Sequence, residues 1–318
     1  MRVSFIGGGT DYLPFVETNG GLVLASSIDK YVYVNILKLP DFAREKYRFT
    51  YRVTESVDRI EDFKHPSLRE SLIASNWNLP LNIATMADVP GSSGLGSSSS
   101  FVVALKLALN QYLGAESKSE DLAKFAISIE RERLMEPGGL QDQYEASFGG
   151  MRIYRFGKNN YESQSLNLEN SQLAEISRHF SLIFLPSERI SDSHARDTAT
   201  ADRNILETML NETEMIVEEI CQAKTSSQIV EILHKAIRID WSLKEQFSSS
   251  LTNASIAEAI KVCKNNGVKA IKLCGAGGGG FLLAGHEPEI RGRLTAVFPE
   301  GFVIPAVFTS QGAEVILK

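Results

Sequence analysis

The chain has 318 residues, which is long enough for two domains of ordinary size. Its hydrophobic content of 43% and charged content of 23% are typical of a globular protein, and a net charge of −6 argues against a nucleic-acid binder. Three cysteines without CxxC spacing argue against a disulfide framework or a zinc site and favour a reducing compartment. Since neither a signal-peptide pattern nor a membrane-length apolar run is present, we expect a cytoplasmic protein.

The chain opens with a predicted strand at 2–6 that stops at Gly7-Gly8-Gly9-Thr10-Asp11. This glycine segment is typical of backbone held close to a ligand, with Asp11 as a side-chain acceptor. It is equally typical of an ordinary glycine turn capped by a small polar residue.

The next part of the first half is predicted to be mostly extended. Residues 38–64 carry many charges and give no clear prediction. The elements that we expect around them are β-rich runs at 21–28 and 31–37 joined by a hairpin turn at Asp29-Lys30, a helix at 67–76 and a strand at 81–87.

A loop rich in glycine and serine, followed directly by an apolar helix, occupies the segment from Asp88 to Leu109. Glycines let the backbone approach a ligand, and the first-turn amides of a helix have no intrahelical acceptor. Such a loop is typical of a phosphate site, although Gly/Ser segments also serve as flexible linkers. It lacks the Gly-Lys-Ser/Thr of a Walker A loop and the third glycine of a dinucleotide fingerprint. We therefore predict a phosphate loop of another kind at 90–100.

Beyond this loop, a capping-box pattern at 117–120 predicts a second helix, which ends at Pro137-Gly138-Gly139. Glu130 lies at the edge of its buried face, in a charged run that by itself indicates a solvated helix surface. By residue type alone, Asp142 is an aspartate in a turn that follows two glycines. A strand at 151–156 closes this half.

The composition turns polar near residue 157, and we divide the chain there into domains at 1–160 and 161–318. The glycine run at 275–280 lies between two strands, where so many glycines cost stability, and we interpret it as backbone in close functional approach. The second half is predicted to contain helices at 200–222, 226–247, 253–265 and 287–298 and strands at 180–186, 268–273, 281–284, 302–308 and 313–317.

The three glycine-rich motifs resemble those of the GHMP small-molecule kinases, over essentially the whole chain. The family patterns R-V-N-L-I-G-x-x-T-D-Y, P-x-x-x-G-L-G-S-S and K-x-x-G-A-G-x-G-G correspond to 2–12, 90–98 and 272–280. Glu130 and Asp142, which precedes Gln143, have the twelve-residue separation of the galactokinase branch. The resemblance implies an α+β, two-domain GHMP kinase fold. It has an ATP-binding N-terminal domain like ribosomal protein S5 domain 2 and a ferredoxin-like C-terminal domain.

Within the family, GGGTD and the segments at 27–34 and 137–144 look most like the D-glycero-D-manno-heptose 7-phosphate kinases. This implies an ATP-dependent sugar kinase that phosphorylates the anomeric C1 hydroxyl of heptose 7-phosphate. The resulting 1,7-bisphosphate would serve nucleotide-activated heptose synthesis for surface polysaccharide. The segment at 185–189 keeps only the arginine of the subgroup's T-G-x-x-R pattern. Two alternatives therefore stay open, a sugar-1-kinase for another sugar such as fucose and a non-catalytic sugar sensor.

The resemblance also implies a role for individual residues. Asp142 is the implied general base for the sugar hydroxyl, and Arg2 beside it keeps that carboxylate ionised. Ser98 and Glu130 are the implied Mg²⁺ ligands, since this cation prefers oxygen donors. The nucleotide phosphates would be bound by Pro90, Gly91, Ser92, Ser93, Gly94, Leu95, Gly96, Ser97, Ser98 and Ser99. The sugar would be bound by Gly8, Gly9, Thr10, Asp11, Lys30, Gly277 and Gly278.

The expected partners are therefore ATP, Mg²⁺ and a sugar phosphate, with no nucleic acid and no membrane, while the oligomeric state is not readable. The cations near the glycine motifs that could hold the phosphate of the sugar are Lys30, Arg189, Arg196 and Lys272. Lys30 is also open to a simpler interpretation as an exposed lysine of a hairpin.

Overall fold

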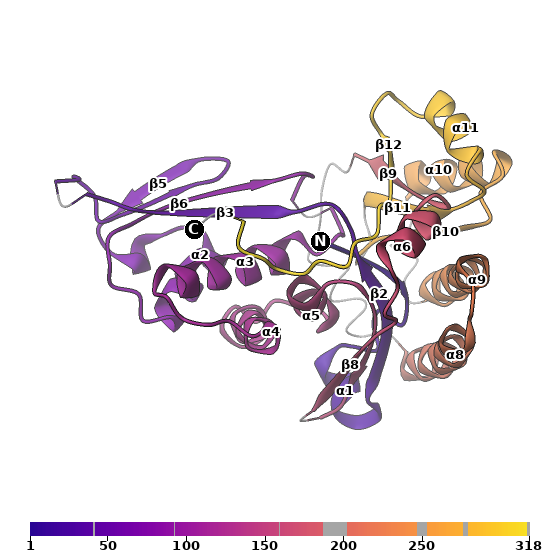
Figure 1. Cartoon of the computed structure of the whole chain (residues 1–318), viewed down its shortest axis with the longest axis horizontal. Coiled ribbons are helices and arrows are strands. Elements are labelled where there is room, and N and C mark those ends of the chain that lie inside the picture. Colours follow the sequence, from indigo (N-terminus) through magenta and orange to yellow (C-terminus); the bar gives the residue numbers. More distant parts are fainter. Residues whose placement is uncertain are drawn as a thin grey trace.

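The structure, a computed structural model, describes residues 1–40, 42–91, 93–158, 160–186, 202–246, 253–275 and 279–316. These residues form three four-stranded sheets with helices packed around them, in an elongated molecule (Figure 1). None of the helices in the described ranges combines the length and the apolarity that crossing a bilayer requires.

The first sheet contains the N-terminal strand and is antiparallel throughout, in the order β1-β2-β7-β8. Its second strand is buried at every position, which explains why that stretch of sequence is apolar or small without alternation. A short helix that the sequence did not predict follows the first motif. The bounds are β1 (Arg2–Ile6), α1 (Leu13–Asn19), β2 (Gly21–Ser27), β7 (Met151–Phe156) and β8 (Tyr161–Ser165).

The second sheet has the order β3-β6-β4-β5 and carries α2 and α3 on one face (Figure 1). Two of its strands lie in the charged stretch at 38–64, for which no element was predicted. The bounds are β3 (Val32–Lys38), β4 (Tyr47–Thr50), β5 (Thr54–Val57), η1 (Ile60–Asp62), α2 (Pro66–Ala74), β6 (Leu81–Ala87) and α3 (Ser97–Tyr112).

The predicted hairpin between 21–28 and 31–37 is wrong, because β2 and β3 belong to different sheets. The intervening residues are instead held by the far end of the chain. Ile28 forms a β-bridge with Phe308, and the Asp29 amide donates to the carbonyl of Val307 at 2.9 Å. Distant pairing therefore replaces the local turn that the sequence suggested.

A group of helices packed against α3 and β2 carries the two acidic residues singled out by the sequence. Glu130 lies in a π-helical segment that continues α4, and Asp142 lies in the first turn of a short helix. The interpretation of Asp142 as a turn residue after two glycines is therefore corrected. The bounds are α4 (Ser119–Ile127), η2 (Ser128–Arg133) and α5 (Gln141–Phe148).

The third sheet is antiparallel, in the order β10-β11-β9-β12, and forms the other end of the molecule with its helices. Residues 313–316 form no strand, contrary to the prediction for 313–317. The division at residue 160 stays a prediction. The bounds are α6 (Asn170–Ser177), β9 (Phe180–Leu185), α8 (Arg203–Gln222), α9 (Ser226–Lys244), α10 (Ala254–Asn265), β10 (Ala270–Leu273), β11 (Gly280–Gly285), α11 (Ile290–Val297) and β12 (Val303–Pro305).

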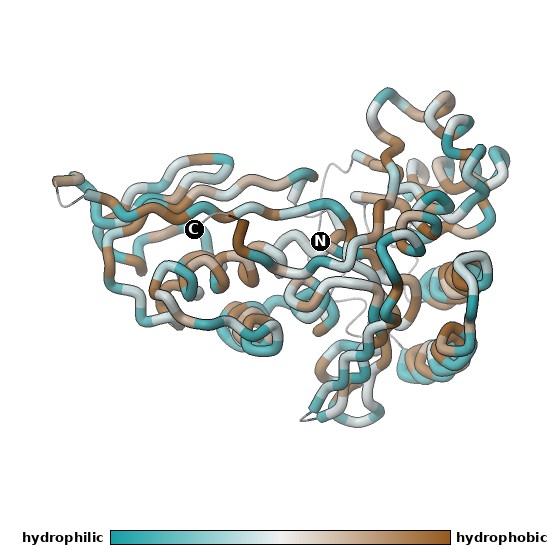
Figure 2. The backbone as a smooth tube through the Cα atoms, viewed as in Figure 1, coloured by the Kyte–Doolittle hydropathy of each residue, from teal (hydrophilic) through white to brown (hydrophobic). Residues whose placement is uncertain are grey.

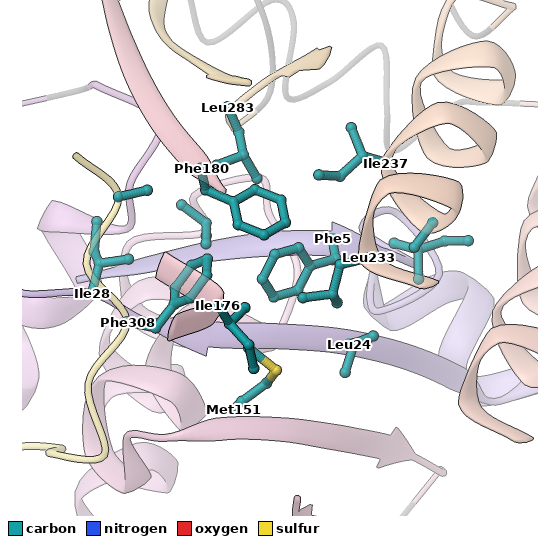
Figure 3. Packing of buried hydrophobic residues seen from close by; sticks show 14 of the residues in the cluster. Phe5, Leu24, Ile28, Met151, Ile176, Phe180, Leu233, Ile237, Leu283 and Phe308 are labelled. Carbon is teal, nitrogen blue, oxygen red and sulfur yellow. The ribbon is translucent and has the colours of Figure 1, made fainter. Parts of the chain in front are cut away.

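One apolar core joins the two halves of the chain. The rings of Phe5, Phe180 and Phe308 lie with their centroids 5.4 to 6.0 Å apart, and Leu233 of α9 packs beside them (Figure 3). Each buried aromatic ring contributes about 1.5–3 kcal/mol. Figure 2 shows that hydrophobic residues follow the inward side of α8 and α9. Strand β1, which begins with Arg2, is therefore fixed from both halves.

Candidate active site

The second and third glycine motifs lie against each other, backbone to backbone. A Cβ on Gly94 would lie 2.3 Å from the carbonyl oxygen of Cys274, and one on Gly275 would lie 2.6 Å from Cα of Gly94. Likewise, a Cβ on Gly280 would lie 2.4 Å from the carbonyl oxygen of Ser93. These glycines of the third motif are thus needed for contact with the phosphate loop. Ser92, Gly277 and Gly278 lie outside the described residues.

The phosphate loop ends at the N-terminus of α3. Gly96 is the N-cap residue in the left-handed conformation, with φ 74° and ψ 28°, and no side chain caps the helix. The first-turn amides of this 16-residue helix consequently have no side-chain acceptor. Ser98, in this first turn, is exposed. An uncapped helix N-terminus beside a glycine loop is suited to bind phosphate oxygens.

Arg2 and Asp142 form an ion pair that contacts this loop at Gly94 and Gly96. Nε and Nη2 of Arg2 both lie 2.7 Å from Oδ1 of Asp142, and Nη1 donates to the carbonyl of Gly94 at 2.7 Å. A Cβ on Gly96 would lie 3.4 Å from Oδ2, so the second carboxylate oxygen faces the phosphate loop. Burial acts to lower the pKa of Arg2, but the charge and hydrogen bond of Asp142 outweigh it and raise the pKa. Oδ1 of Asp142 is thus held by Arg2, and Oδ2 faces the phosphate loop.

Glu130 is 1% exposed and is held from two sides. Its Oε2 accepts hydrogen bonds from Ser99 Oγ, at 2.7 Å, and from the side-chain amide of Gln143. Ser99, which is predicted to bind nucleotide, contacts this carboxylate through its hydroxyl. Among the described residues no cluster of three His, Cys, Asp or Glu could hold a metal ion. A single carboxylate such as that of Glu130 nevertheless suits Mg²⁺, which takes one or two carboxylates and fills its other positions with phosphates and water.

The first glycine motif is tied to the helix that carries Asp142. Asp11 is completely buried, and its carboxylate accepts the amides of Gly9 and Gln141, each at 3.0 Å. A Cβ on Gly139 would lie 2.0 Å from Oδ2 of Asp11, so this position requires glycine. Thr10 is also buried and bonds to backbone carbonyls. The Asp11 side chain therefore holds the loop to the N-terminus of α5, and the Thr10 side chain holds it to Leu22 of β2. Both residues are predicted to bind sugar.

The two predicted phosphate-binding cations that the structure describes contact different carboxylates. Nζ of Lys30 lies 2.6 Å from its neighbour Asp29, and Lys272 is fully buried against Asp240. Arg189 and Arg196 lie outside the described residues. The structure adds Lys244 of α9, whose ammonium lies 3.2 Å from Asp240 and beside Gly8. Asp240 and Lys244 are four residues apart on a helix, a spacing that sequence reasoning assigns to a surface pair.

Comparison with known proteins decides the family. The family model for the GHMP kinases N terminal domain matches residues 65–150, and that for the GHMP kinases C terminal domain matches residues 218–299. Together they cover just over half of the chain. The chain belongs to the GHMP kinase family. It is thus a phosphotransferase with an alcohol group as acceptor, and ATP is the phosphoryl donor of such kinases.

Individual relatives of this GHMP kinase differ in how far they match. The D-glycero-alpha-D-manno-heptose 7-phosphate kinase of Campylobacter jejuni is 27% identical, over 99% of this chain and 96% of its own. The bifunctional fucokinase/GDP-fucose pyrophosphorylase of Arabidopsis thaliana is 22% identical, over 92% of this chain but only 30% of its own.

Among solved structures, a D-glycero-D-manno-heptose 1-phosphate kinase of Bacteroides thetaiotaomicron has the same fold. It has a TM-score of 0.76 and 21% identity, and the match covers 98% of this chain and 95% of that one. The two-domain α+β fold implied by the three motifs is therefore confirmed.

Proposed function

We propose that this GHMP kinase transfers the γ-phosphoryl group of ATP to the anomeric C1 hydroxyl of D-glycero-D-manno-heptose 7-phosphate. The observation that carries the proposal is the Asp142 carboxylate, fixed through Oδ1 by Arg2 and facing Gly96 of the phosphate loop through Oδ2. The choice of sugar is supported by the full-length similarity to a heptose 7-phosphate kinase. We also propose that the enzyme acts in the cytoplasm, where sugar and ATP are both available.

In this reaction Asp142 accepts the proton of the C1 hydroxyl as that oxygen forms a bond to the γ-phosphorus. The bond between this phosphorus and the bridging oxygen breaks, and ADP leaves. An anomeric hydroxyl is more acidic than an ordinary alcohol, so an ionised carboxylate is an adequate base. Arg2 holds the Asp142 carboxylate in place through their ion pair and stabilises the developing sugar oxyanion.

The phosphate loop supplies the remaining charge stabilisation. The free amides at the start of α3 would hold the nucleotide phosphates between Gly94 and Ser98. Ser98 and Glu130 would hold Mg²⁺, which neutralises charge on the phosphates when it is bound. In this arrangement Ser99 and Gln143 orient the Glu130 carboxylate.

The proposal is tested by ADP release from purified protein with ATP, Mg²⁺ and a panel of sugars and sugar phosphates. The panel includes heptose 7-phosphate, free heptose, fucose, galactose and mevalonate. We expect the highest kcat/KM with heptose 7-phosphate. A higher kcat/KM with another acceptor would show that heptose 7-phosphate is not the preferred substrate. Binding of ATP and sugar without any ADP release would refute the kinase activity and favour a sugar sensor.

A further inference from the structure

A second ion cluster lies on the other side of the first glycine motif, where α9 packs against β1 and β10. Asp240 is completely buried, and its Oδ2 contacts the ammonium groups of both Lys272 and Lys244. The side chains of Lys272 and Lys244 are 2% and 13% exposed. Two lysines thus share one carboxylate, which leaves one positive charge in excess at a site with little access to water.

We assign the excess charge to Lys244, because Lys272 makes the shorter contact with Asp240. Lys272 is the closer of the two lysines to Asp240, and burial, opposed by Asp240 and assisted by Lys244, lowers its pKa to about 8. The ammonium of Lys244 lies beside the first motif, 3.1 Å from the position that a Cβ on Gly8 would take. Because a buried excess charge is costly, an anion at this position would stabilise the cluster.

Two neutral polar groups converge on the same position. The same point on Gly8 lies 3.2 Å from the side-chain nitrogen of Gln141 and 3.4 Å from Oγ of Ser4. Within the described part of the chain, Ser4 Oγ and Gln141 Oε1 are buried and have no hydrogen-bond partner. A hydroxyl, an amide and an ammonium group can all donate, and a phosphate offers three acceptor oxygens.

This position also has a fixed relation to the reacting groups. Ser4 is two residues from Arg2 on β1, so their side chains share a face of the strand about 7 Å apart. Gln141 directly precedes Asp142 at the start of α5. A sugar whose C1 hydroxyl meets Asp142 can therefore extend its other end toward Lys244.

We propose that Lys244, Gln141 and Ser4 form the subsite for the phosphate that the sugar substrate already carries. In this arrangement Lys272 neutralises Asp240, and Lys244 is left to pair with the substrate. Gly8 keeps the first motif free of a side chain where the phosphate oxygens lie. This inference rests on the proposed function, because it names the part of the site that distinguishes a sugar phosphate from a free sugar.

The first test is the ratio of kcat/KM for heptose 7-phosphate to that for free heptose. We expect Lys244→Met to lower this ratio at least about tenfold, because the variant loses a charge-assisted hydrogen bond to the phosphate. Lys244→Arg should restore part of the ratio. Lys235→Met is the matched control, since Lys235 lies on the same helix, exposed and paired with Glu219. An unchanged ratio in Lys244→Met, or an equal loss on both substrates, would overturn the subsite.

The second test does not depend on turnover. Inorganic phosphate is titrated calorimetrically into the protein saturated with ADP, so that the phosphate loop is already occupied. We expect a site whose Kd rises at least tenfold in Lys244→Met and is unchanged in Lys235→Met. Such a site in a protein that phosphorylates no heptose would support the subsite and refute the proposed substrate. Phosphate affinity that is independent of Lys244 would refute the subsite even if heptose 7-phosphate is the substrate.

Discussion

Two ion clusters flank the first glycine motif, and they differ in their balance of charge. At Arg2 and Asp142, one cation meets one carboxylate that is 22% exposed. At Asp240, two lysines meet one carboxylate that has no exposure. The balanced pair leaves a carboxylate oxygen free for proton transfer, whereas the unbalanced cluster leaves an ammonium group free for an anion. The balance of charge and the degree of burial thus distinguish the proposed catalytic pair, Arg2 and Asp142, from the cluster proposed to bind the phosphate of the substrate.

Because the two clusters differ in burial, they should also contribute differently to the free energy of folding. Arg2 is buried, but the Asp142 carboxylate is 22% exposed, so water partly screens this pair and its loss costs less folding free energy than the loss of a pair without exposure. Removing one partner from a buried cluster leaves an uncompensated charge and costs much more. Variants at the two carboxylates should therefore behave in opposite ways, one losing turnover and the other losing stability.

The largest effect is expected for Asp142→Asn. The variant keeps its shape but cannot accept the hydroxyl proton, so turnover should fall by about 10²–10⁴-fold while ADP affinity stays within about twofold. The control is Asp121→Asn, which changes an exposed aspartate in the first turn of α4. A variant that keeps more than about a third of wild-type turnover would remove Asp142 from the mechanism.

The next effect concerns folding. Asp240→Asn leaves Lys244 and Lys272 without their shared counter-charge, and we expect the free energy of unfolding to fall by about 3–5 kcal/mol. Urea denaturation at pH 7 measures the loss, and Asp121→Asn again serves as the exposed control. If Asp240→Asn is as stable as the control, Asp240 does not compensate the charge of the two lysines, and the proposed difference between the two clusters is wrong.

A smaller effect is expected at the proposed Mg²⁺ ligands. Ser98→Ala and Glu130→Gln should each raise the Mg²⁺ concentration for half-maximal rate by at least about tenfold, because even the loss of a group that only orients a metal ligand costs about 10–100-fold in metal affinity. The neighbouring Ser97→Ala should raise it less, because one loop hydroxyl is expected to face the cation. Titration curves of the first two variants that overlay the wild type would show that the cation is bound elsewhere.

The smallest effect is a pH dependence that only the unbalanced cluster should produce. The folded pKa of Lys272 is about 8 and lies below that of an unfolded lysine, about 10.4. Between these values the unfolded chain binds more protons, so the contribution of Lys272 to stability rises with pH, by about 1 kcal/mol per pH unit. The gain in unfolding free energy of wild type over Lys272→Met should therefore increase from pH 8 to pH 10. A gap that shrinks with pH would contradict the direction of this pKa shift.

Much of the fold could be predicted where the apolar periodicity of the sequence extends over a long segment. The periodic helices near 203–222, 226–244 and 254–265 and the helix after the phosphate loop match the expected segments closely. Short strands in a charged stretch, such as β4 and β5, leave too few apolar positions for a period to be recognised. The hairpin error has a different cause, since the segment between β2 and β3 pairs with residues near 308, and no local sequence signal indicates such distant pairing.

Some residues of the site could likewise be predicted from the sequence, whereas others could not. The three glycine motifs and the spacing of Glu130 and Asp142 point to a kinase site, because each is a continuous or fixed pattern. The orienting contacts of Ser99 with Glu130 and of Asp11 with Gln141 depend on how loops fold together. Asp240 and Lys244 escaped prediction because a helical pair four residues apart looks like a surface pair until burial is known.

The central claim is that the Asp142 end of the site phosphorylates the anomeric hydroxyl of a sugar held by its own phosphate. The most direct measurement is the phosphorus NMR spectrum of the product made from ATP and heptose 7-phosphate. We predict one new phosphomonoester signal coupled to the anomeric proton, beside an unchanged signal of the 7-phosphate. A new phosphate coupled to any other sugar proton, or no new sugar phosphate at all, would contradict this account.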